Sequence, residues 1–341
     1  MEQQKRRRRM PPYGWMLLLS GGLLVLFVLS FLWGRYDATL GEILQSFLAK
    51  LGLMPPVSDT LSAVLFRIRL PRILLAMLVG AALSTAGTCY QSVFQNPMAA
   101  PDILGASSGA AFGAALGILL HVPTLWITLF AFAGGLLSIG LVYLVGIHAS
   151  GKRIVNLILA GVMISSLFSA GTSLIKLVAD PVDALPAITY WLMGSLAGAT
   201  MREVWFLLVP FLLAVIPLLL LRWRLNLLTL GDDEARSMGV APNTLRTVVL
   251  LLATLLTAAS VSVSGMIGWV GLVIPHLSRK LVGNDHRALL PTSVLFGALF
   301  LLLTDNLSRT LFAVEIPIGI LTAFVGAPFF LYLLIRKEAK Q

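Results

Sequence analysis

Long apolar runs recur along the whole chain and set the strongest limit on its fold. Each run is about 20 residues long, the length that a helix needs to cross the hydrocarbon core of a bilayer. The sequence lacks the apolar and polar alternation of barrel strands, so helices are expected rather than an outer-membrane barrel. The sequence predicts an all-α polytopic membrane protein with ten transmembrane helices, over residues 13–33, 64–93, 103–120, 123–147, 154–177, 203–221, 246–265, 267–282, 289–308 and 317–335.

The composition agrees with a membrane protein and argues against other classes. The 341 residues are 58% hydrophobic and 12% charged, with a mean hydropathy of +0.92, which is too apolar for a soluble globular domain. The net charge of +10 comes from basic residues dispersed at the ends of the apolar runs, without a nucleic-acid recognition motif. We therefore expect a single transmembrane domain over residues 1–341 and no nucleic-acid partner.

The distribution of basic residues predicts the orientation in the membrane. The run over 13–33 follows a KRRRR segment, is as long as a full span and lacks a small-x-small cleavage site, so an uncleaved first span is expected. Ten spans place both termini on one side. If that side is the cytoplasm, 17 of the 25 lysines and arginines lie there, as the positive-inside rule requires. Residues 1–12 are then a basic cytoplasmic N-terminus, and residues 222–245 form a cytoplasmic loop.

Four arginines contradict this trend because they lie on the outer side. Arg67, Arg69 and Arg72 cluster in the segment FRIRLPR, and Arg309 follows the ninth span. Long cationic side chains can snorkel to the membrane surface, which is one interpretation. The other is a docking surface for an acidic partner outside the membrane. Asp305 precedes Arg309 by four residues, and the two are expected to pair along one helix.

The segment LGDDEARSMGVAP, residues 230–242, predicts a short charged helix in the cytoplasmic loop. Its acidic residues suit the positive end of a helix, the glycine suits its stop, and Pro242 prevents continuation. A helix of about eight residues is roughly 12 Å long. Its charges could simply keep the loop solvated, but a preformed helix is better explained as a handle for a partner protein. The candidate residues are Gly231, Asp232, Asp233, Glu234, Ala235, Arg236, Met238 and Gly239.

Two motifs resemble enzyme signatures but fail on inspection. The segment GIHASGKR, residues 146–153, nearly matches a phosphate-binding loop, but Arg153 replaces the Ser or Thr that would hold magnesium. The segment GASSG, residues 105–109, matches a nucleophile elbow without the strand-turn-helix setting that the motif requires. We therefore expect no ATPase or other enzyme activity from this chain alone. The four histidines show no ligand spacing, so no metal site is predicted.

A glycine stripe explains the second motif better. Glycine recurs at every fourth position, which lets another helix backbone approach closely. The residues of this predicted packing stripe are Gly105, Gly109, Gly113 and Gly117.

Five segments, taken together, resemble one family of membrane proteins. They are RIRLPRILLAMLVGAALSTAG, QNPMAAPDILGASSGA, LGDDEARSMGV, GMIGWVGLVIPHLSRKLVGNDHRALLP and EIPIGILTAFVGAPFF, and they extend from the second span to the last. Their order and spacing are similar to those of the FecCD/BtuC-like permeases. These are the membrane subunits of type II ABC importers for ferric siderophores, haem and cobalamin.

The resemblance implies a set of partners. Such permeases have ten spans and form a homodimer or paired halves around a central pore. They bind two separate ATPase subunits, which hold ATP and magnesium, and a periplasmic binding protein delivers the substrate. The segment GDDEARSMGV matches the family's coupling helix, which docks in a cleft of the ATPase. Arginines that match Arg69 and Arg309 meet acidic residues on the binding protein.

The resemblance also implies an inner gate, built by the loops after the second and fourth spans. The matching residues are Asn96 and Met98 in QNPM, and Ile154 and Val155 in RIVN. An Asn-Pro step breaks a helix, and the apolar side chains could close a pore by excluding water. QNPM could instead be an ordinary turn.

The fifth span is the candidate pore lining because it carries hydroxyls on an otherwise apolar helix. These hydroxyls could instead bond to their own backbone. The residues are Ser165, Ser166, Ser169 and Thr172.

The sequence thus favours the permease subunit of an ATP-driven importer in the bacterial inner membrane. A metal chelate is the expected substrate, with a ferric siderophore ahead of haem, cobalamin or an oxyanion such as molybdate. The alternative is a self-sufficient secondary transporter or channel for a small solute. The scarcity of ionisable residues within the spans counts against that alternative.

Overall fold

The structure of the chain is a computed structural model. It describes residues 10–34, 36–55, 57–148 and 153–338. Every regular element in these stretches is a helix, which confirms the predicted all-α fold. The stretch 1–9 of the basic N-terminus and residues 149–152 of the GIHASGKR segment lie outside the described residues.

Seven helices are long and apolar enough to cross a membrane. They are α1 (Pro12–Leu32), the continuous helix formed by α3 (Asp59–Ala63), η1 (Val64–Arg69) and α4 (Leu70–Val93), α6 (Thr124–His148), α7 (Arg153–Val178), α9 (Met201–Leu228), α11 (Pro242–Ser264) and α13 (His286–Thr310). Three further helices are shorter or less apolar: α5 (Ala106–Leu119), α12 (Val270–Val282) and α14 (Ile318–Glu338).

The ten predicted runs all fall on these helices, but not all of the helices match a bilayer in length. The 13 residues of α12 extend about 20 Å at 1.5 Å per residue. This is less than the roughly 30 Å of a hydrocarbon core. The count of ten membrane crossings therefore stays a prediction.

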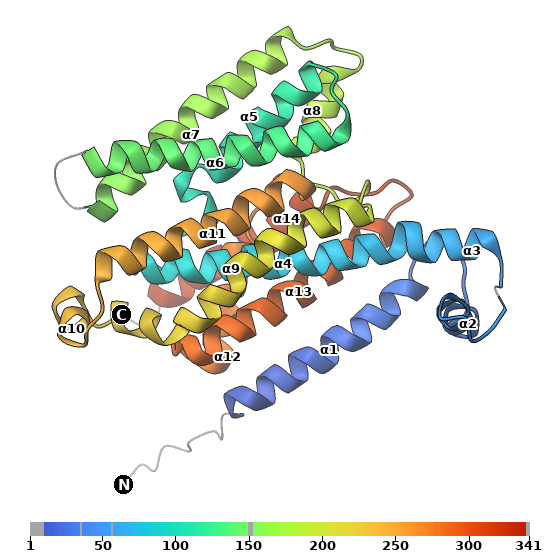
Figure 1. Ribbon diagram of the computed structural model, residues 1–341, viewed down its shortest axis with the longest axis horizontal. Coiled ribbons are helices and arrows are strands. Elements are labelled where there is room, and N and C mark those ends of the chain that lie inside the picture. The colour runs from blue at the N-terminus through green and yellow to red at the C-terminus, as the bar shows by residue number, and fades with distance from the viewer. Residues whose placement is uncertain (1–9, 35, 56, 149–152, 339–341) are drawn as a thin grey trace.

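Short helices connect the longer ones. These are α2 (Leu40–Lys50), η2 (Pro101–Leu104), α8 (Ala184–Leu192) and α10 (Asp232–Ser237). Figure 1 shows α10 at one end, beside α9 and α11, and α2 with α3 at the other. The chain therefore presents two distinct polar ends, one around α10 and one around α2, which are called the α10 end and the α2 end below.

Helix α4 runs through the centre of the bundle and is almost wholly buried. It packs against α9, α11, α12 and α13. Two glycines permit this approach. A Cβ atom on Gly80 would lie 2.2 Å from the carbonyl oxygen of Gly297, and one on Gly87 would lie 1.8 Å from that of Gly271. Backbone contact at these two points sets the distance between α4 and its neighbours.

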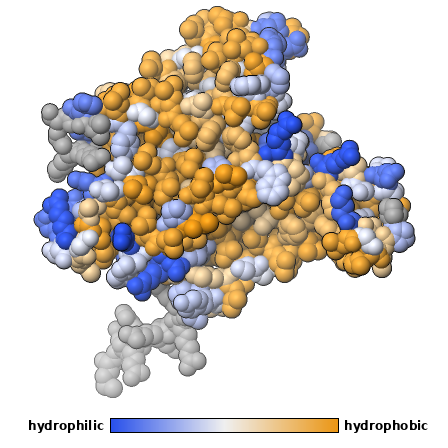
Figure 2. Space-filling model, in the orientation of Figure 1, coloured by the Kyte–Doolittle hydropathy of each residue, from blue (hydrophilic) through white to orange (hydrophobic). Residues whose placement is uncertain are grey.

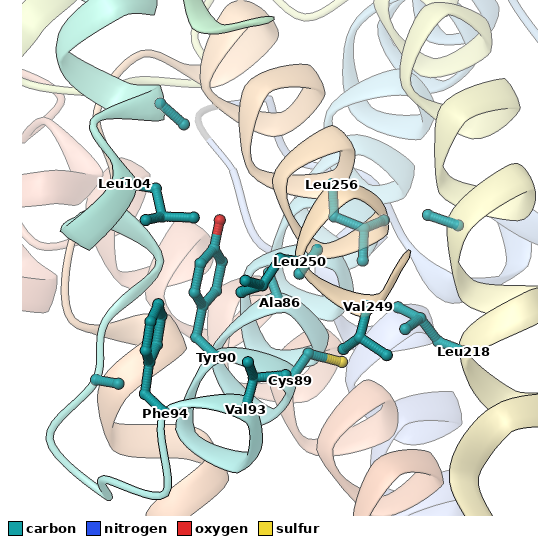
Figure 3. Close-up of a cluster of buried hydrophobic side chains, with 14 of the residues drawn as sticks. Ala86, Cys89, Tyr90, Val93, Phe94, Leu104, Leu218, Val249, Leu250 and Leu256 are labelled. Carbon is teal, nitrogen blue, oxygen red and sulfur yellow. The ribbon is translucent and has the colours of Figure 1, made fainter. Parts of the chain in front are cut away.

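The core beside these contacts is built from small and branched side chains. Figure 3 shows Ala86, Cys89 and Tyr90 of α4 facing Val249 and other residues of α11. The Tyr90 hydroxyl bonds to Thr254 of α11 at 2.6 Å, so this buried polar group has a partner. Cys89 is a buried free thiol within the same core.

The predicted glycine stripe is correct for three of its four members. Gly109, Gly113 and Gly117 pack directly against the backbone of α6. Gly105 does not belong to the helix face. It lies before α5 with a φ of 77°, where it ends η2, and it contacts the hydroxyls of Ser138 and Ser165. The predicted single helix over 103–120 is therefore broken at Gly105, because this left-handed conformation interrupts helical hydrogen bonding.

Hydrophobic side chains cover the middle of the molecule. Figure 2 shows them over most of the visible face, while hydrophilic side chains gather towards the α10 end and the α2 end. Many large apolar residues are exposed on the long helices, including Leu17, Leu177 and Leu220. A surface of this kind is stable in a hydrocarbon solvent rather than in water.

Because α5 and α6 approach closely, a methyl group added between them should destabilise the protein. The variant Gly113→Ala places a Cβ atom 2.0 Å from the Phe130 carbonyl oxygen, so the helices must separate. We expect a loss of about 1–3 kcal/mol in stability, the usual cost of overpacking. Gly140→Ala is the matched control, because nothing lies within 4 Å of that position. Thermal unfolding in detergent would measure both, and equal midpoints would contradict the assigned packing.

Candidate functional site

Helix α10 lies on an arm between α9 and α11. It comprises six residues, Asp232–Ser237, rather than the expected eight. The difference arises at its C-terminal side, where Met238 ends the helix and Gly239 takes a φ of 78°. Pro242 then opens α11 as its first residue. The predicted helix is therefore present but shorter.

An ion pair attaches this arm to the bundle. Arg246 of α11 donates two hydrogen bonds to Asp232, at 2.6 and 2.9 Å. These bonds to the ionised form lower the pKa of Asp232. Ala235, a residue of α10 itself, is fully buried. The arm is thus fixed from one side by a bidentate pair and by packing.

The opposite side of α10 is free to meet another molecule. Asp233, Glu234 and Arg236 are exposed, and Met238 is 55% exposed. Asp233 and Arg236 form a pair at 3.1 Å, with 92% and 59% of their side chains exposed. Such a pair contributes little to stability because both charges remain in water. These charges are therefore available for contact with a partner.

The candidate gate residues fall into two groups. Ile154 and Val155 line a cavity of about 450 Å³ that Asp232 and Arg246 also line. Asn96 and Met98 form an exposed turn after α4, where the Asn96 side chain accepts a hydrogen bond from the Met98 backbone at 2.9 Å. The structure thus brings one gate segment beside the arm of α10. The role of the four residues as a gate stays a prediction.

The four candidate pore-lining residues on α7 differ in their exposure. Ser166 and Ser169 are exposed, but Thr172 is buried and Ser165 is partly buried beside Gly105. The Thr172 hydroxyl donates to the Phe168 carbonyl at 2.9 Å. The Ser166 hydroxyl likewise bonds to the backbone one turn earlier. Thr172 is thus buried within the single chain, and the role of the four residues as a pore lining stays a prediction.

The outer arginines differ most from expectation. An exposed cluster was one interpretation, but only Arg67 is exposed, while Arg69, Arg72 and Arg309 are between 4% and 8% exposed. Arg69 donates to the carbonyl oxygens of Phe31 and Tyr36. Burial is possible because these backbone acceptors, left open where α1 ends, replace water around the guanidinium group.

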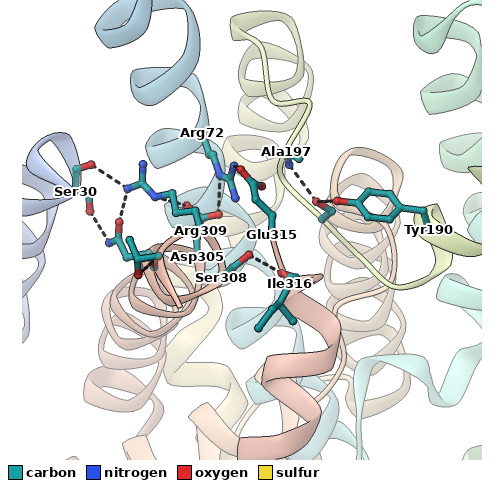
Figure 4. A network of polar contacts seen from close by, with 12 residues as sticks. Ser30, Arg72, Tyr190, Ala197, Asp305, Ser308, Arg309, Glu315 and Ile316 are labelled. Atoms are coloured by element: carbon teal, nitrogen blue, oxygen red, sulfur yellow. Dashed lines mark hydrogen bonds and ion pairs between the residues drawn. The ribbon is translucent and has the colours of Figure 1, made fainter. Parts of the chain in front are cut away.

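The other two buried arginines share carboxylates (Figure 4). Arg72 pairs with Asp305 and with Glu315, each at 2.9 Å. Arg309 lies 3.7 Å from Asp305, so the expected pair along α13 is present. Glu315 was not singled out in the sequence, since it reaches Arg72 from 243 positions away along the chain. Only its place beside the apolar segment IPIGIL could have drawn attention to it.

This network surrounds a small cavity at the α2 end of the molecule. The cavity measures about 220 Å³ and is lined by Arg69, Arg72, Arg309 and Glu315 among others. Asp305 and Glu315 pair with Arg72, and Asp305 also lies 3.7 Å from Arg309. Asp37 acts electrostatically on Arg69, so the three guanidinium groups lie near three carboxylates. The Nη2 atom of Arg72 is buried without a hydrogen-bond partner. The charges at this end are therefore balanced largely within the chain.

A larger cavity lies between η2, α5, α8, α12 and α14. It measures about 820 Å³, and its lining includes Asp102, Ser107, Met266, Trp269 and Phe324. Ser107 donates a hydrogen bond to Asp102 within it. Most of the lining is apolar. Among the described residues, no group of three or more histidines, cysteines or carboxylates is close enough to hold a metal ion.

The Asp232–Arg246 pair predicts how the arm responds to pH. Because the pKa of Asp232 is lowered below its ordinary 3.8, the pair stabilises the arm at every pH above that value. This contribution is lost as the pH falls through the folded-state pKa. Hydrogen exchange of residues 232–238 should therefore stay protected from pH 8 to pH 5, while Asp232→Asn loses protection throughout. Equal protection in both proteins at pH 7 would contradict this role for the pair.

Comparison with known proteins gives matches over nearly the full length. The model of the FecCD transport family matches residues 22–336. The molybdate import permease MolB of Haemophilus influenzae is 43% identical over 308 residues, which cover 90% of this chain and 91% of that protein. The hemin transport permease HmuU of Yersinia pestis is 38% identical over 335 residues, which cover 95% and 97%.

A solved structure agrees with these relatives. It is described as the inward-facing conformation of an ABC transporter assigned to the metal-chelate type. The two folds align with a TM-score of 0.85 at 41% identity, over 94% of this chain and 98% of that chain. Since the family model and the relatives each span most of the sequence, this chain belongs to the FecCD transport family of multi-pass ABC transporter permeases.

Proposed function

We propose that this chain is the permease of an importer that carries a metal chelate into the cytoplasm. Ten helices span the bacterial inner membrane as one domain, with both termini in the cytoplasm. A second copy of the permease completes the substrate path. Two separate ATPase subunits bind ATP and magnesium, and a periplasmic binding protein delivers the chelate. The chain itself binds no cofactor.

The observation that carries this proposal is the geometry of α10. Its inner face is held by Arg246 and by the burial of Ala235, while its outer face presents Asp233, Glu234 and Arg236 to solvent. A solvated loop has no need of a bidentate pair and a buried alanine. A helix that is rigidly attached on one side and charged on the other is suited to transmit force from a docked ATPase.

The choice of a metal chelate rests on the larger cavity. Its volume of about 820 Å³ lies within the range of pockets that enclose drug-sized ligands. Relatives are named for molybdate, hemin, cobalamin and iron dicitrate. A small oxyanion needs much less space, and the apolar lining offers it few donors. We therefore favour a ferric siderophore, which the ligand of the cognate binding protein would identify.

A self-sufficient secondary transporter is the competing function. Such carriers use ionisable residues within the membrane to couple ions to substrate. Asp305 is a buried carboxylate of this type, but it is held between Arg72 and Arg309. Both cations lie within ion-pair distance of this one carboxylate, at 2.9 and 3.7 Å. This arrangement favours a structural role for Asp305 over proton relay.

The first experiment replaces the exposed charges of α10. The triple variant Asp233→Ala, Glu234→Ala, Arg236→Ala should lower ATP-driven transport at least about tenfold, because it removes charged contacts worth a few kcal/mol at an interface. The measurement is uptake into proteoliposomes that contain permease, ATPase and binding protein.

The matched control is the triple variant Asp37→Ala, Asp59→Ala, Lys50→Ala, which removes two acids and one base that are exposed at the α2 end. The ATPase should bind to this variant as well as it binds to the wild type. Normal uptake by the α10 variant would show that α10 is only a solvated loop.

The second experiment concerns the docking of the binding protein. If its acidic residues approach the arginine-lined cavity, Arg67→Glu should slow their association, because Arg67 is the exposed member of the group. The effect should be larger at 0.01 M salt, where the Debye length is about 30 Å, than at 0.15 M, where it is about 8 Å. Arg202→Glu is the control, since Arg202 is an exposed cation at the start of α9, outside the segment that carries Arg67, Arg69 and Arg72.

The association rate with permease in nanodiscs would measure the effect. Identical rates for wild type and Arg67→Glu at both salt concentrations would leave snorkelling as the better account of that residue. The buried arginines are unsuited to this test because each holds buried partners: Arg69 bonds to backbone carbonyl oxygens, and Arg72 and Arg309 pair with the buried carboxylate of Asp305. Breaking a buried ion pair costs about 3–5 kcal/mol, so such variants would change the fold as well as the docking.

A further inference from the structure

A partly buried polar cluster lies at the α10 end of the molecule, apart from the residues assigned so far. Ser92 comes from the last turn of α4, Asn226 from the last turn of α9, and Asp285 with His286 from the start of α13. Ser92 is 4% exposed and His286 is 3% exposed, while Asn226 is partly buried and Asp285 is exposed. Three helices that are distant in sequence therefore place hydrogen-bonding groups around one buried Ser–His contact.

Asn226 occupies the centre of this cluster in a single orientation. Its side-chain oxygen accepts a hydrogen bond from the His286 backbone at 2.9 Å, so the amide cannot be flipped. Its side-chain nitrogen donates to Asp285 at 2.7 Å. Asp285 also accepts from the Arg287 backbone and thereby caps α13. The end of α9 is thus fixed to the start of α13 by two bonds through one side chain.

The orientation of Asn226 determines the tautomer of His286. The Nδ1 atom lies 2.7 Å from the same Asn226 oxygen, which can only accept, so Nδ1 carries the proton. In the neutral ring Nε2 is then an acceptor, and it faces the Ser92 hydroxyl. Ser92 also lies within bonding distance of the Thr88 carbonyl in α4. A directed path of hydrogen bonds therefore runs from α9 through the imidazole ring to α4.

A second connection runs parallel to the first. The Gln95 side chain donates to the Leu228 carbonyl at 2.6 Å. Leu228 is the last residue of α9, directly before the arm that leads to α10, and Gln95 directly precedes the Asn96–Met98 turn. Gln95 has a φ of 48°, which is costly for a residue other than glycine, so its position is fixed by its contacts. The Gln95–Leu228 bond thus joins the start of the Asn96–Met98 turn to the start of the arm that leads to α10.

We propose that Ser92, His286 and Asn226 form a brace that makes the turn after α4 move together with the arm of α10. The brace residues position other groups and contact neither substrate nor nucleotide. The inference rests on the proposed function, because it assumes that a docked ATPase moves α10. Hydrogen bonds to the buried side chains of Ser92 and His286 suit this task, since each is costly to leave unmade and the ends of α9 and α4 cannot separate without breaking them.

The test measures coupling rather than assembly. The complex of permease, ATPase and binding protein is reconstituted in proteoliposomes, and substrate uptake is divided by ATP hydrolysed. Asn226→Ala and His286→Phe should each lower this ratio about tenfold, the loss expected for one or two buried hydrogen bonds. The ATPase should still copurify, because the exposed charges of α10 are unchanged. His286→Asn keeps a donor at the Nδ1 position and should restore part of the ratio.

A label on the turn gives an independent measurement. Met98→Cys introduces an exposed thiol, whereas the single native cysteine, Cys89, is buried. In nanodiscs, addition of ATP should change the labelling rate at position 98 in an otherwise wild-type complex. The change should be lost with Asn226→Ala. Ser92→Ala, a milder variant that removes one hydroxyl, should reduce it if the stronger variants do not fold.

The control is Ser84→Ala. Ser84 is fully buried and also bonds α4 to α13, through the Ser293 carbonyl at 2.8 Å, but it lies outside the brace. It should leave the coupling ratio and the labelling response unchanged. Wild-type ratios in the brace variants would overturn the brace, as would loss of ATPase binding in step with coupling. Absence of ATP-driven uptake by the wild-type complex would instead overturn the proposed function.

Discussion

The close backbone contacts of α4 are the constraint on which the rest of the structure depends. Gly80 meets Gly297 of α13 and Gly87 meets Gly271 of α12, and neither contact leaves room for a Cβ atom. In a bilayer, helices associate through packing and interhelical hydrogen bonds rather than through exclusion of water. The glycines bring neighbouring backbones close enough for both. The polar side chains at the two ends of α4 can reach their partners only because this distance is short.

Helix α4 therefore carries the polar connections at both ends of the molecule. Arg72 pairs with Asp305 of α13 at the α2 end, and Ser92 meets His286 of α13 at the α10 end. Between them lies a core of small residues, with hydrogen bonds from Tyr90 to Thr254 and from Ser84 to the Ser293 carbonyl. A displacement of α13 relative to α4 at one end would disturb the network at the other. This geometry suits a protein whose two ends respond to different partners.

Much of the fold could be predicted from the sequence because hydrophobic length and period are local signals. The ten apolar runs, the charged helix and three of the four stripe glycines are where the sequence placed them. Two failures are local, the break at Gly105 and the early end of α10, where a glycine takes a positive φ. The others depend on tertiary contacts. The burial of Arg72 requires Glu315, which lies far along the chain. Likewise, no local pattern in the sequence marks His286 as part of a polar network, since its partners Ser92 and Asn226 lie on other helices.

The distribution of charge also bears on where energy enters the molecule. The described ionic groups that are buried include Arg69, Arg72, Asp305 and Arg309, which gather at the α2 end, where Asp305 lies within ion-pair distance of two arginines. Protonation of that carboxylate would leave both cations without their partner, which counts against a proton relay through it. The proposed function therefore draws its energy from the α10 end, where the exposed charges of α10 are available to a partner.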